Sequence, residues 1–238
     1  IAGMLGLEDV LKRRANNLTA DAKQKISLGR GLVREDVGAV LFDEPLTVID
    51  PHLKWQLRRK LREIHEQLNL TLVYVTHDQT EALTFADKVV VMLAGQVLQV
   101  GTPQALFERP EHTFVGYFIG SPGMNFFDCE VDGNEALVGD ERVQVDPAMA
   151  EAARNAGGRL QLGIRPGLIR PAGEGETGHR VKVDKIEDLG DYELVTGHFG
   201  GSEVHVRLDE TTKIDSDGLR VVFPVDNVLL YSDDRLVG

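Results

Sequence analysis

The most informative segment of this chain spans residues 40–45 and reads Val-Leu-Phe-Asp-Glu-Pro. A short apolar run ends there in two adjacent carboxylates, Asp43 and Glu44. Residues 71–77 repeat the pattern as Thr-Leu-Val-Tyr-Val-Thr-His and end in His77. Apolar runs of this length are typical of strands buried on both faces, as in parallel sheets. Ligands of such sheets bind beyond the carboxyl ends of the strands, so we expect these polar residues to share one site.

Apolar residues at helical spacing surround the two runs. We expect helices over residues 1–17 and 18–32, and Thr19 can cap the second because its hydroxyl accepts a backbone N–H. A third helix should begin at Asp50, since Asp before proline is a typical helix start, and its apolar residues recur every three or four positions to residue 68. The shorter elements expected here are strands over 38–43 and 71–76 and a helix around 80–86.

The character of the sequence changes near residue 125. Before it we expect a hairpin over 89–100, a helix that starts at Thr102, and another with its apolar face over 114–119. After it, short alternating runs separated by Gly and Asp predict a small all-β barrel or sandwich. These runs are 180–183, 203–208 and 227–231. The sequence therefore predicts an α/β domain over 1–124 and a mostly β domain over 125–238.

Composition excludes several classes of protein. The formal net charge of −12 argues against nucleic acid as a partner, because phosphate backbones are bound by clustered Lys and Arg. The one cysteine, Cys129, excludes an internal disulfide, and we interpret it as a small apolar residue. No apolar run approaches the roughly eighteen residues that span a bilayer. The chain starts without methionine inside a segment of helical spacing, so we expect it to be a fragment.

The polar strand ends suit phosphoryl chemistry. An Asp at the end of a buried strand can support Mg²⁺, which prefers a few hard oxygen ligands together with substrate phosphates. Glu44 can orient a water for in-line attack on a γ-phosphoryl group, and His77 can bind a phosphate oxygen beside it. The alternatives are a strand that merely surfaces into a polar loop and a structural histidine. His77 and Glu81 lie one helical turn apart, but two candidate ligands do not make a metal site.

Together these motifs resemble those of a known family, the ATPases of ABC transporters. Residues 41–50 resemble the Walker B motif and D-loop, 75–83 the switch-histidine segment, and 28–34 the helix after the signature motif. Within 101–126, several short motifs look like the branch that imports maltose-type sugars. They are Gly101-Thr102-Pro103, Phe107, Arg109-Pro110, residues 118–122 and Met124-Asn125-Phe126. Residues 162–166 resemble the regulatory barrels of that branch, so the resemblance implies an OB-like barrel after the α/β domain.

The resemblance also implies roles for single residues. Asp43 would support Mg²⁺, Glu44 would polarise the attacking water, and His77 would be the switch that senses the γ-phosphate of ATP. Asp50 would cross the interface to a second ATPase subunit. The barrel over 125–238 would bind partners or regulators and help the two ATPase subunits stay together.

For the whole protein, the resemblance implies an ATP-binding and ATP-hydrolysing subunit that powers an importer of sugars or related solutes. It would lie at the cytoplasmic face of the membrane, against transmembrane permease subunits. A solute-binding protein outside the cell would act with it indirectly. The alternatives are a regulatory or degenerate subunit in a heterodimeric pair, and a soluble ABC ATPase that acts on nucleic acid or ribosomes. The acidic balance, and a β domain without a basic groove of stacking aromatics, argue against the last.

Two departures from the family pattern affect these expectations. The dipeptide Gly-Lys is absent, so the loop that would hold the phosphates is missing, as are the Q-loop and the adenine-stacking aromatic. We therefore expect this chain alone to be inactive.

The second departure lies in the signature motif, where Leu-Ser-Gly-Gly-Gln of the family falls on residues 18–22, Leu-Thr-Ala-Asp-Ala. Thr19 keeps the hydroxyl. Ala20 adds bulk and Asp21 a negative charge where glycine N–H groups would approach a partner's γ-phosphate. Either the variant is tolerated, with Asp21 turned to solvent, or the subunit works beside a different ATPase subunit whose signature is intact.

Overall fold

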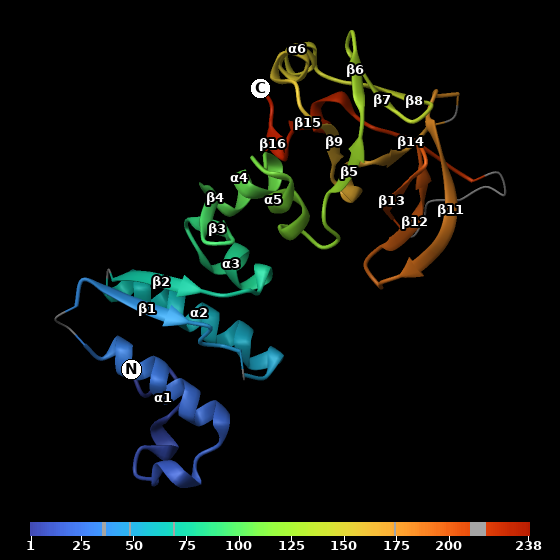
Figure 1. Ribbon diagram of the computed structural model, residues 1–238. Helices are drawn as coiled ribbons and strands as arrows, with labels where there is room; N and C mark the ends of the chain where they lie inside the picture. Colours follow the sequence, from blue (N-terminus) through green and yellow to red (C-terminus); the bar gives the residue numbers. More distant parts are fainter. Residues whose placement is uncertain (35–36, 48, 69, 174, 210–217) are drawn as a thin grey trace. The chain divides into compact units, whose positions relative to one another are not determined.

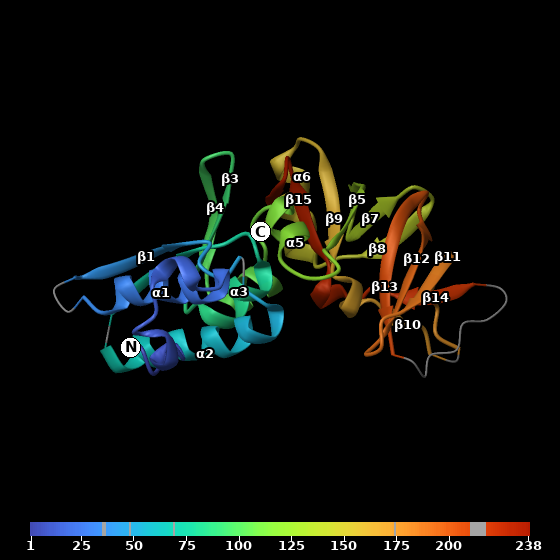
Figure 2. The ribbon, with the colours of Figure 1, turned by 90° about the horizontal axis from the view of Figure 1, so that it is seen from below.

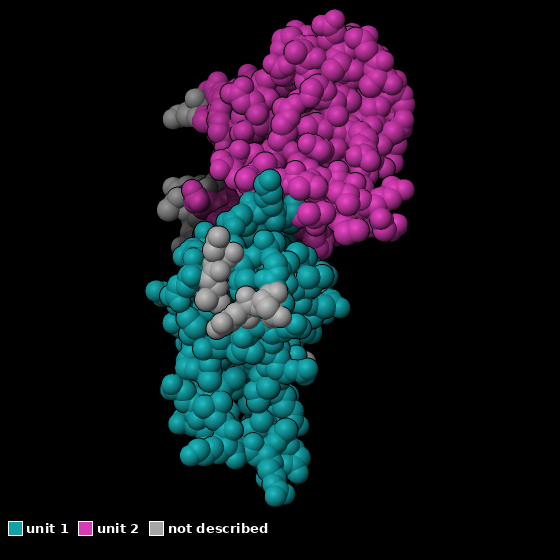
Figure 3. Space-filling model, turned by 90° about the vertical axis from the view of Figure 1, so that its left-hand side faces the viewer, with its two compact units in different colours: residues 1–89 teal, residues 90–238 magenta. Residues whose placement is uncertain are grey.

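The chain divides into two compact units, residues 1–89 and 90–238, drawn in different colours in Figure 3. This computed structural model describes all residues except 35–36, 48, 69, 174 and 210–217, and the side chains of 51, 52 and 68. Contacts group residues 90–124 with the β-rich part of the chain. The domain boundary at 124 stays a prediction.

Unit 1 is built on a two-stranded parallel sheet with two long helices packed against one face (Figures 1 and 2). Its main elements are α1 (Ala20–Leu32), β1 (Ala39–Asp43), α2 (Pro51–Leu68), β2 (Thr71–Val75) and α3 (Gln79–Phe85). These lie within one or two residues of the predicted elements. The strands pair in register, with Asp43 opposite Val75, so both strands end at the same edge of the sheet.

Only one face of this sheet is covered. Val40 and Phe42 are buried against residues of α1 and α2 such as Leu28 and Leu61. On the other face the side chains are exposed: Leu41 by 74%, Val73 by 44% and Val75 by 54%. The prediction of strands buried on both faces is wrong, because both helices lie on the same side and no other described element of unit 1 packs on the opposite one.

The predicted helix over residues 1–17 is also wrong. The segment forms turns and two short 3₁₀ helices, η1 (Glu8–Val10) and η2 (Ala15–Asn17). Gly6 adopts φ +64°, a left-handed conformation that a continuing α-helix does not allow. Some of the apolar residues still face the core, since Leu5 and Leu7 are buried, whereas Leu11 is exposed. The spacing thus predicted the burial of Leu5 and Leu7 but not the secondary structure of the segment.

Unit 2 starts with a hairpin and two short helices and continues as a β-barrel with one helix. The hairpin and helices are β3 (Val89–Leu93), β4 (Gln96–Gly101), α4 (Pro103–Glu108) and α5 (Thr113–Phe118). The predicted cap is present, since Thr102 Oγ1 accepts a hydrogen bond from Ala105 N at 3.2 Å. The barrel region contains β5 (Asn125–Asp128), β6 (Glu130–Asp132), β7 (Glu135–Val138), β8 (Glu141–Gln144), α6 (Pro147–Ala156), β9 (Leu160–Ile164), β10 (Arg170–Pro171), β11 (His179–Asp188), β12 (Glu193–Phe199), β13 (Ser202–Leu208), β14 (Leu219–Val222), β15 (Leu229–Ser232) and β16 (Arg235–Leu236), with 3₁₀ turns η3 (Pro166–Leu168) and η4 (Val225–Asn227).

Three antiparallel sheets enclose the core of this region. Their strand orders are β10-β14-β11-β12-β13, β16-β15-β9-β5 and β6-β7-β8. Phe127, Val195 and Tyr231 are fully buried among their inward faces. Gly200 and Gly201 connect β12 to β13 with positive φ at both positions, as a two-residue turn between twisted strands requires. Cys129 packs against this core, and burial raises the pKa of its thiol to about 11.

Sequence analysis did not predict α6. Its start carries the same Asp-Pro signal that predicted α2. Asp146 Oδ1 accepts hydrogen bonds from Ala148 N at 2.9 Å and Met149 N at 3.0 Å, and Pro147 occupies the first turn. The α/β unit followed by an OB-like barrel confirms the predicted fold class.

Candidate active site

The carboxyl ends of β1 and β2 place Glu44 next to the residues that follow β2. The backbone of Glu44 donates a hydrogen bond to Val75 O at 2.9 Å, which extends the parallel pairing by one residue. Glu44 then turns away from the strand direction with φ 44°, a left-handed conformation uncommon for a residue with a side chain. Such backbone strain occurs most often at functional sites.

Glu44 and His77 are in direct contact. Nδ1 of His77 lies 2.9 Å from Oε1 of Glu44, and the Thr47 hydroxyl donates to Oε2 at 3.2 Å. The side chains of His77 and Glu44 are 72% and 44% exposed, so a ligand can reach both. Their hydrogen bond lowers the pKa of Glu44 and raises the pKa of His77, and their opposite charges act in the same directions.

This geometry defines what the pair can do. A carboxylate whose pKa lies below its ordinary value stays ionised at neutral pH and can orient a water molecule. The imidazole uses Nδ1 for Glu44, which leaves Nε2 as the ring nitrogen for a ligand. The strand ends therefore present a proton acceptor and a hydrogen-bond donor side by side.

Asp43 is the last residue of β1, and its side chain is exposed. In the described part of the chain, no three His, Cys, Asp or Glu side chains are grouped to hold a metal ion. Mg²⁺ is commonly bound by one or two carboxylates together with the phosphates of its substrate. Asp43 thus fits a metal that arrives with a nucleotide and does not form a metal cage of its own.

Thr19, Ala20 and Asp21 form the start of α1. Thr19 Oγ1 accepts a hydrogen bond from Ala22 N at 3.2 Å, so the predicted cap is confirmed. Asp21 Oδ2 lies 2.9 Å from Lys25 Nζ, one turn further along the helix. The side chain of Asp21 is therefore held against the helix by Lys25, which offsets the charge that we expected to repel a phosphate.

One further contact joins α1 to the strand ends. Gln24 of α1 donates through Nε2 to the carbonyl oxygen of Glu44 at 3.5 Å. Asp50 is exposed and lies at the start of α2, where its carbonyl oxygen accepts hydrogen bonds from Leu53 N and Lys54 N. Of the predicted site residues, Glu44 and His77 are thus brought together, and the described polar contacts of Thr19 and Asp21 stay within α1.

A buried carboxylate lies beneath the histidine loop. Glu81 of α3 is only 3% exposed, and its Oε2 accepts hydrogen bonds from Tyr74 and Thr76. Sequence analysis considered Glu81 only as a partial metal ligand. The burial of Glu81 between a strand and a helix could not be predicted from the sequence. The spacing of apolar residues in α3 gives no sign that a carboxylate lies in the core.

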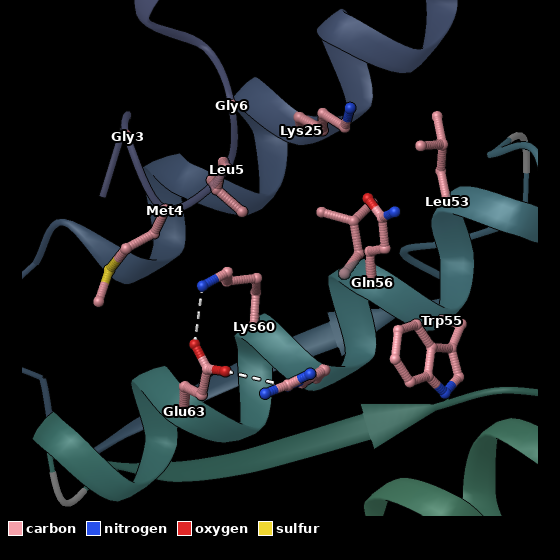
Figure 4. A pocket seen from close by; sticks show the side chains of 12 residues that line it. Gly3, Met4, Leu5, Gly6, Lys25, Leu53, Trp55, Gln56, Lys60 and Glu63 are labelled. Atoms are coloured by element: carbon pink, nitrogen blue, oxygen red, sulfur yellow. Dashed lines mark hydrogen bonds and ion pairs between the residues drawn. The ribbon is translucent and has the colours of Figure 1, made fainter.

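A hollow of unit 1 lies elsewhere, between residues 3–6 and α2 (Figure 4). Its volume is about 570 Å³, and Trp55 and Gln56 lie along it. Lys60 Nζ is 2.9 Å from Glu63 Oε2 at its edge. None of the predicted site residues contributes to this hollow. The exposed side chains of Asp43, Glu44 and His77 thus lie outside this hollow, at the strand ends.

Helices in the described part of the chain do not combine the length and the apolarity that a membrane crossing needs.

Comparisons with known proteins place this geometry in context. A family model described as the MalK OB fold domain matches residues 120–167. An sn-glycerol-3-phosphate import ATP-binding protein, UgpC of Chromobacterium violaceum, is 42% identical over 210 residues, which are 87% of this chain and 56% of the relative. The sulfoquinovosyl glycerol transport ATP-binding protein SmoE of Agrobacterium fabrum is 39% identical over 210 residues, 87% of this chain and 58% of the relative. UgpC 1 of Rhizobium johnstonii is 36% identical over 238 residues, 98% of this chain and 64% of the relative.

The chain is a relative of the ATP-binding subunits of ABC importers. The resemblance drawn from the strand-end motifs is thereby confirmed, together with the OB-like barrel. The chain spans a little over half the length of the curated relatives it matches, 56% to 64%.

At the strand ends, the structure adds contacts that sequence analysis missed. Thr47 contacts the Glu44 carboxylate, Gln24 contacts its backbone, and Thr76 joins the histidine loop to Glu81. Only the position of Thr47, three residues after Glu44, was a usable sequence signal, because a hydroxyl at that spacing can reach back in a turn.

Proposed function

We propose that the whole protein is the ATP-hydrolysing subunit of an ABC importer, and that Glu44 and His77 belong to its hydrolytic site. The observation that carries this proposal is the 2.9 Å contact between His77 Nδ1 and Glu44 Oε1 at the carboxyl ends of two parallel strands. Positioning and charge stabilisation supply most of the catalysis in phosphoryl transfer, and this pair offers both.

In this mechanism, the ionised Glu44 carboxylate accepts a hydrogen bond from a water molecule and orients that water toward the γ-phosphorus. Thr47 holds the second carboxylate oxygen, which limits rotation of the side chain. His77 in its protonated form, which its raised pKa favours, donates from Nε2 to a γ-phosphate oxygen while its Nδ1–H stays on Glu44. Asp43 would hold Mg²⁺ together with phosphate oxygens, and the bound ion would neutralise phosphate charge.

The 238 residues contain no G-x-x-x-x-G-K-[ST] loop, so the residues present do not cradle the phosphates. We therefore propose that this chain by itself neither binds ATP saturably nor hydrolyses it. In the whole protein, Asp50 would reach toward a second ATPase subunit and the permease subunits would bind on the membrane side. The subunit would act at the cytoplasmic face of the membrane.

The names of the relatives guide the proposal on solutes. They refer to sn-glycerol-3-phosphate import and to sulfoquinovosyl glycerol transport. We propose a sugar or a glycerol-containing polyol as the transported solute, with its choice made by the permease and the solute-binding protein.

The experiment compares ATP turnover by the assembled importer that contains the whole protein with turnover by its Glu44→Gln variant. Loss of a positioned base typically costs roughly 10²- to 10⁴-fold in rate, and we expect a loss in this range with ATP binding retained. Glu63→Gln is the matched control, because Glu63 is a half-buried, ion-paired carboxylate on α2. Equal turnover in both variants would refute the proposed role of Glu44.

A second arrangement is favoured by one specific observation, the replacement of the signature glycines by Ala20 and Asp21. In this arrangement the subunit pairs with a different ATPase subunit. The nucleotide site that contains its residues 18–22 then supports only slow turnover. The double substitution Ala20→Gly with Asp21→Gly would then raise turnover. Since Lys25 already offsets the charge of Asp21, unchanged turnover would show that the variant signature is tolerated.

A further inference from the structure

His77 has little around its side chain to hold it in place. The imidazole is 72% exposed, and the contact described for its ring is the one with Glu44, which is itself 44% exposed. Ion pairs between exposed groups contribute little to holding a side chain, because water competes for both charges. The geometry of this pair must therefore come from the backbone that carries the histidine.

That backbone is tied to the buried carboxylate of Glu81. Thr76, immediately before His77, donates its hydroxyl proton to Glu81 Oε2 at 3.0 Å. The same hydroxyl oxygen accepts a hydrogen bond from Asp78 N at 3.0 Å, immediately after His77. One side chain thus holds both neighbours of the histidine to one carboxylate oxygen.

Further contacts fix Glu81 itself. Tyr74 of β2 donates to Oε2 at 2.8 Å, and Lys54 Nζ of α2 lies 3.2 Å from Oε1. Burial, together with the hydrogen bond to Glu81, raises the pKa of Tyr74 far above its ordinary value, so its hydroxyl remains a donor. A buried carboxylate without partners is costly, and these contacts make its burial tolerable. Glu81 is therefore bound to a strand, to a helix and to the histidine loop at once.

We propose that Glu81 is a positioning residue for His77, acting through the Thr76 hydroxyl, which bridges the buried carboxylate and the Asp78 amide. This inference rests on the proposed function, in which His77 contacts the γ-phosphate. Catalytic groups must be held within a fraction of an ångström of their productive geometry, and displacements near 1 Å can cost about 10²-fold in rate. The competing explanation is that Glu81 only attaches α3 to β2 and stabilises unit 1.

Three substitutions separate these explanations. Thr76→Val removes the bridging hydroxyl and keeps the shape of the side chain, whereas Thr76→Ser keeps the hydroxyl. Tyr74→Phe is the matched control, because it removes the other donor to the same carboxylate oxygen and leaves the bridge to Asp78 intact. The charged groups around His77 remain the same in all three: Glu44, Asp78, Glu81 and Lys54.

Two measurements are made on each variant. The first is the pKa of His77 in the 238-residue chain, followed by NMR of the imidazole. We expect Thr76→Val to lower this pKa toward its ordinary value of 6.5, and Thr76→Ser and Tyr74→Phe to leave it near that of the parent chain. The second is turnover by the assembled importer, where Thr76→Val should lower kcat by about 10-fold or more with the KM for ATP unchanged.

Equal shifts of the His77 pKa in Thr76→Val and Tyr74→Phe, or no shift in either, would overturn the inference. If Glu81 only stabilised unit 1, loss of either hydroxyl donor should have the same effect on His77. If Thr76→Val does not fold, the smaller Thr76→Ala makes the same test. The NMR result stands even if turnover of the importer proves insensitive to Glu44→Gln. Failure of the proposed function is therefore distinguishable from failure of the link between Glu81 and His77.

Discussion

Apolar residues are buried to different extents in the sheet of unit 1 and in the barrel of unit 2. In the barrel, inward side chains such as Phe127 and Val195 are enclosed on all sides by three sheets and α6. In the sheet, Val40 and Phe42 are buried while Leu41 and its neighbours on β2 remain exposed. The chemistry-bearing strand ends therefore belong to the part of the chain whose apolar surface is incompletely covered, whereas the described inward residues of the barrel are buried.

The two regions are held in place by different kinds of contact. The barrel is stabilised by burial of apolar area on the inward faces of its strands. The site edge of unit 1 is ordered by polar contacts, those of Glu44 with His77 and Thr47 and those of Glu81 with Thr76. Substitutions in the two regions should accordingly differ in size and in kind.

The largest expected effect is in the barrel core. Phe127 is fully buried, with its ring centroid 5.3 Å from that of Phe199 and 6.2 Å from that of Phe223. Phe127→Ala should lower the free energy of unfolding of unit 2 by about 3–5 kcal/mol, through lost transfer energy and the cavity left behind. Denaturant unfolding followed by a probe in unit 2 measures this. A cost below about 1 kcal/mol would mean that the barrel core is not packed as described.

The same kind of truncation on the open face of the sheet should have almost no effect. Leu41→Ala should change the free energy of unfolding of unit 1 by less than about 0.5 kcal/mol, because the side chain is already largely in contact with water. Val40→Ala, one residue earlier on the covered face, is the matched control and should cost more. Equal costs at the two positions would show that the face of Leu41 is covered in solution.

A small effect is also expected in the pH dependence of stability, from the exposed pair at the strand ends. The pKa of His77 is raised above its ordinary 6.5, so its contribution to stability is present below pH 6.5 and is lost as pH rises through the raised value. The pKa of Glu44 is lowered from 4.5, so its contribution is present above pH 4.5 and is lost as pH falls through the lowered value. The pair should stabilise unit 1 most between about pH 4.5 and 6.5, with a modest effect because both groups are exposed.

The check is the difference in unfolding free energy between the parent chain and Glu44→Gln as a function of pH. This difference should be largest inside that window and should shrink on both sides. Phe127→Ala in the barrel provides the reference, since its cost should not follow this pH profile. A difference that does not vary with pH would contradict the ion pair.

Local signals explain what the sequence predicted well. Thr19 and Thr102 are caps because their hydroxyls reach N–H groups only three residues away, which is a property of the local chain. The meeting of Glu44 and His77 was predictable because parallel strands end at one edge. Both inferences needed only the identity of a strand or helix and its direction.

The remainder depended on tertiary structure. The run of Val40, Leu41 and Phe42 is apolar throughout, and such a run does not show whether a second layer covers the outer face. The contacts of Glu81 join a strand, a loop and two helices, and no spacing in the sequence encodes their meeting. The interpretation of 1–17 as a helix failed at Gly6, whose positive φ was not visible in the apolar pattern.

The central claim is that the two strand ends form one chemical unit through Glu44 and His77. Its most direct test is an NMR titration of the His77 imidazole in the 238-residue chain and in its Glu44→Gln variant. The hydrogen bond and the charge of Glu44 are the main causes of the raised pKa of His77, so the variant should titrate at lower pH, closer to 6.5. Identical titration curves in the two proteins would show that the pair does not form and would contradict the account.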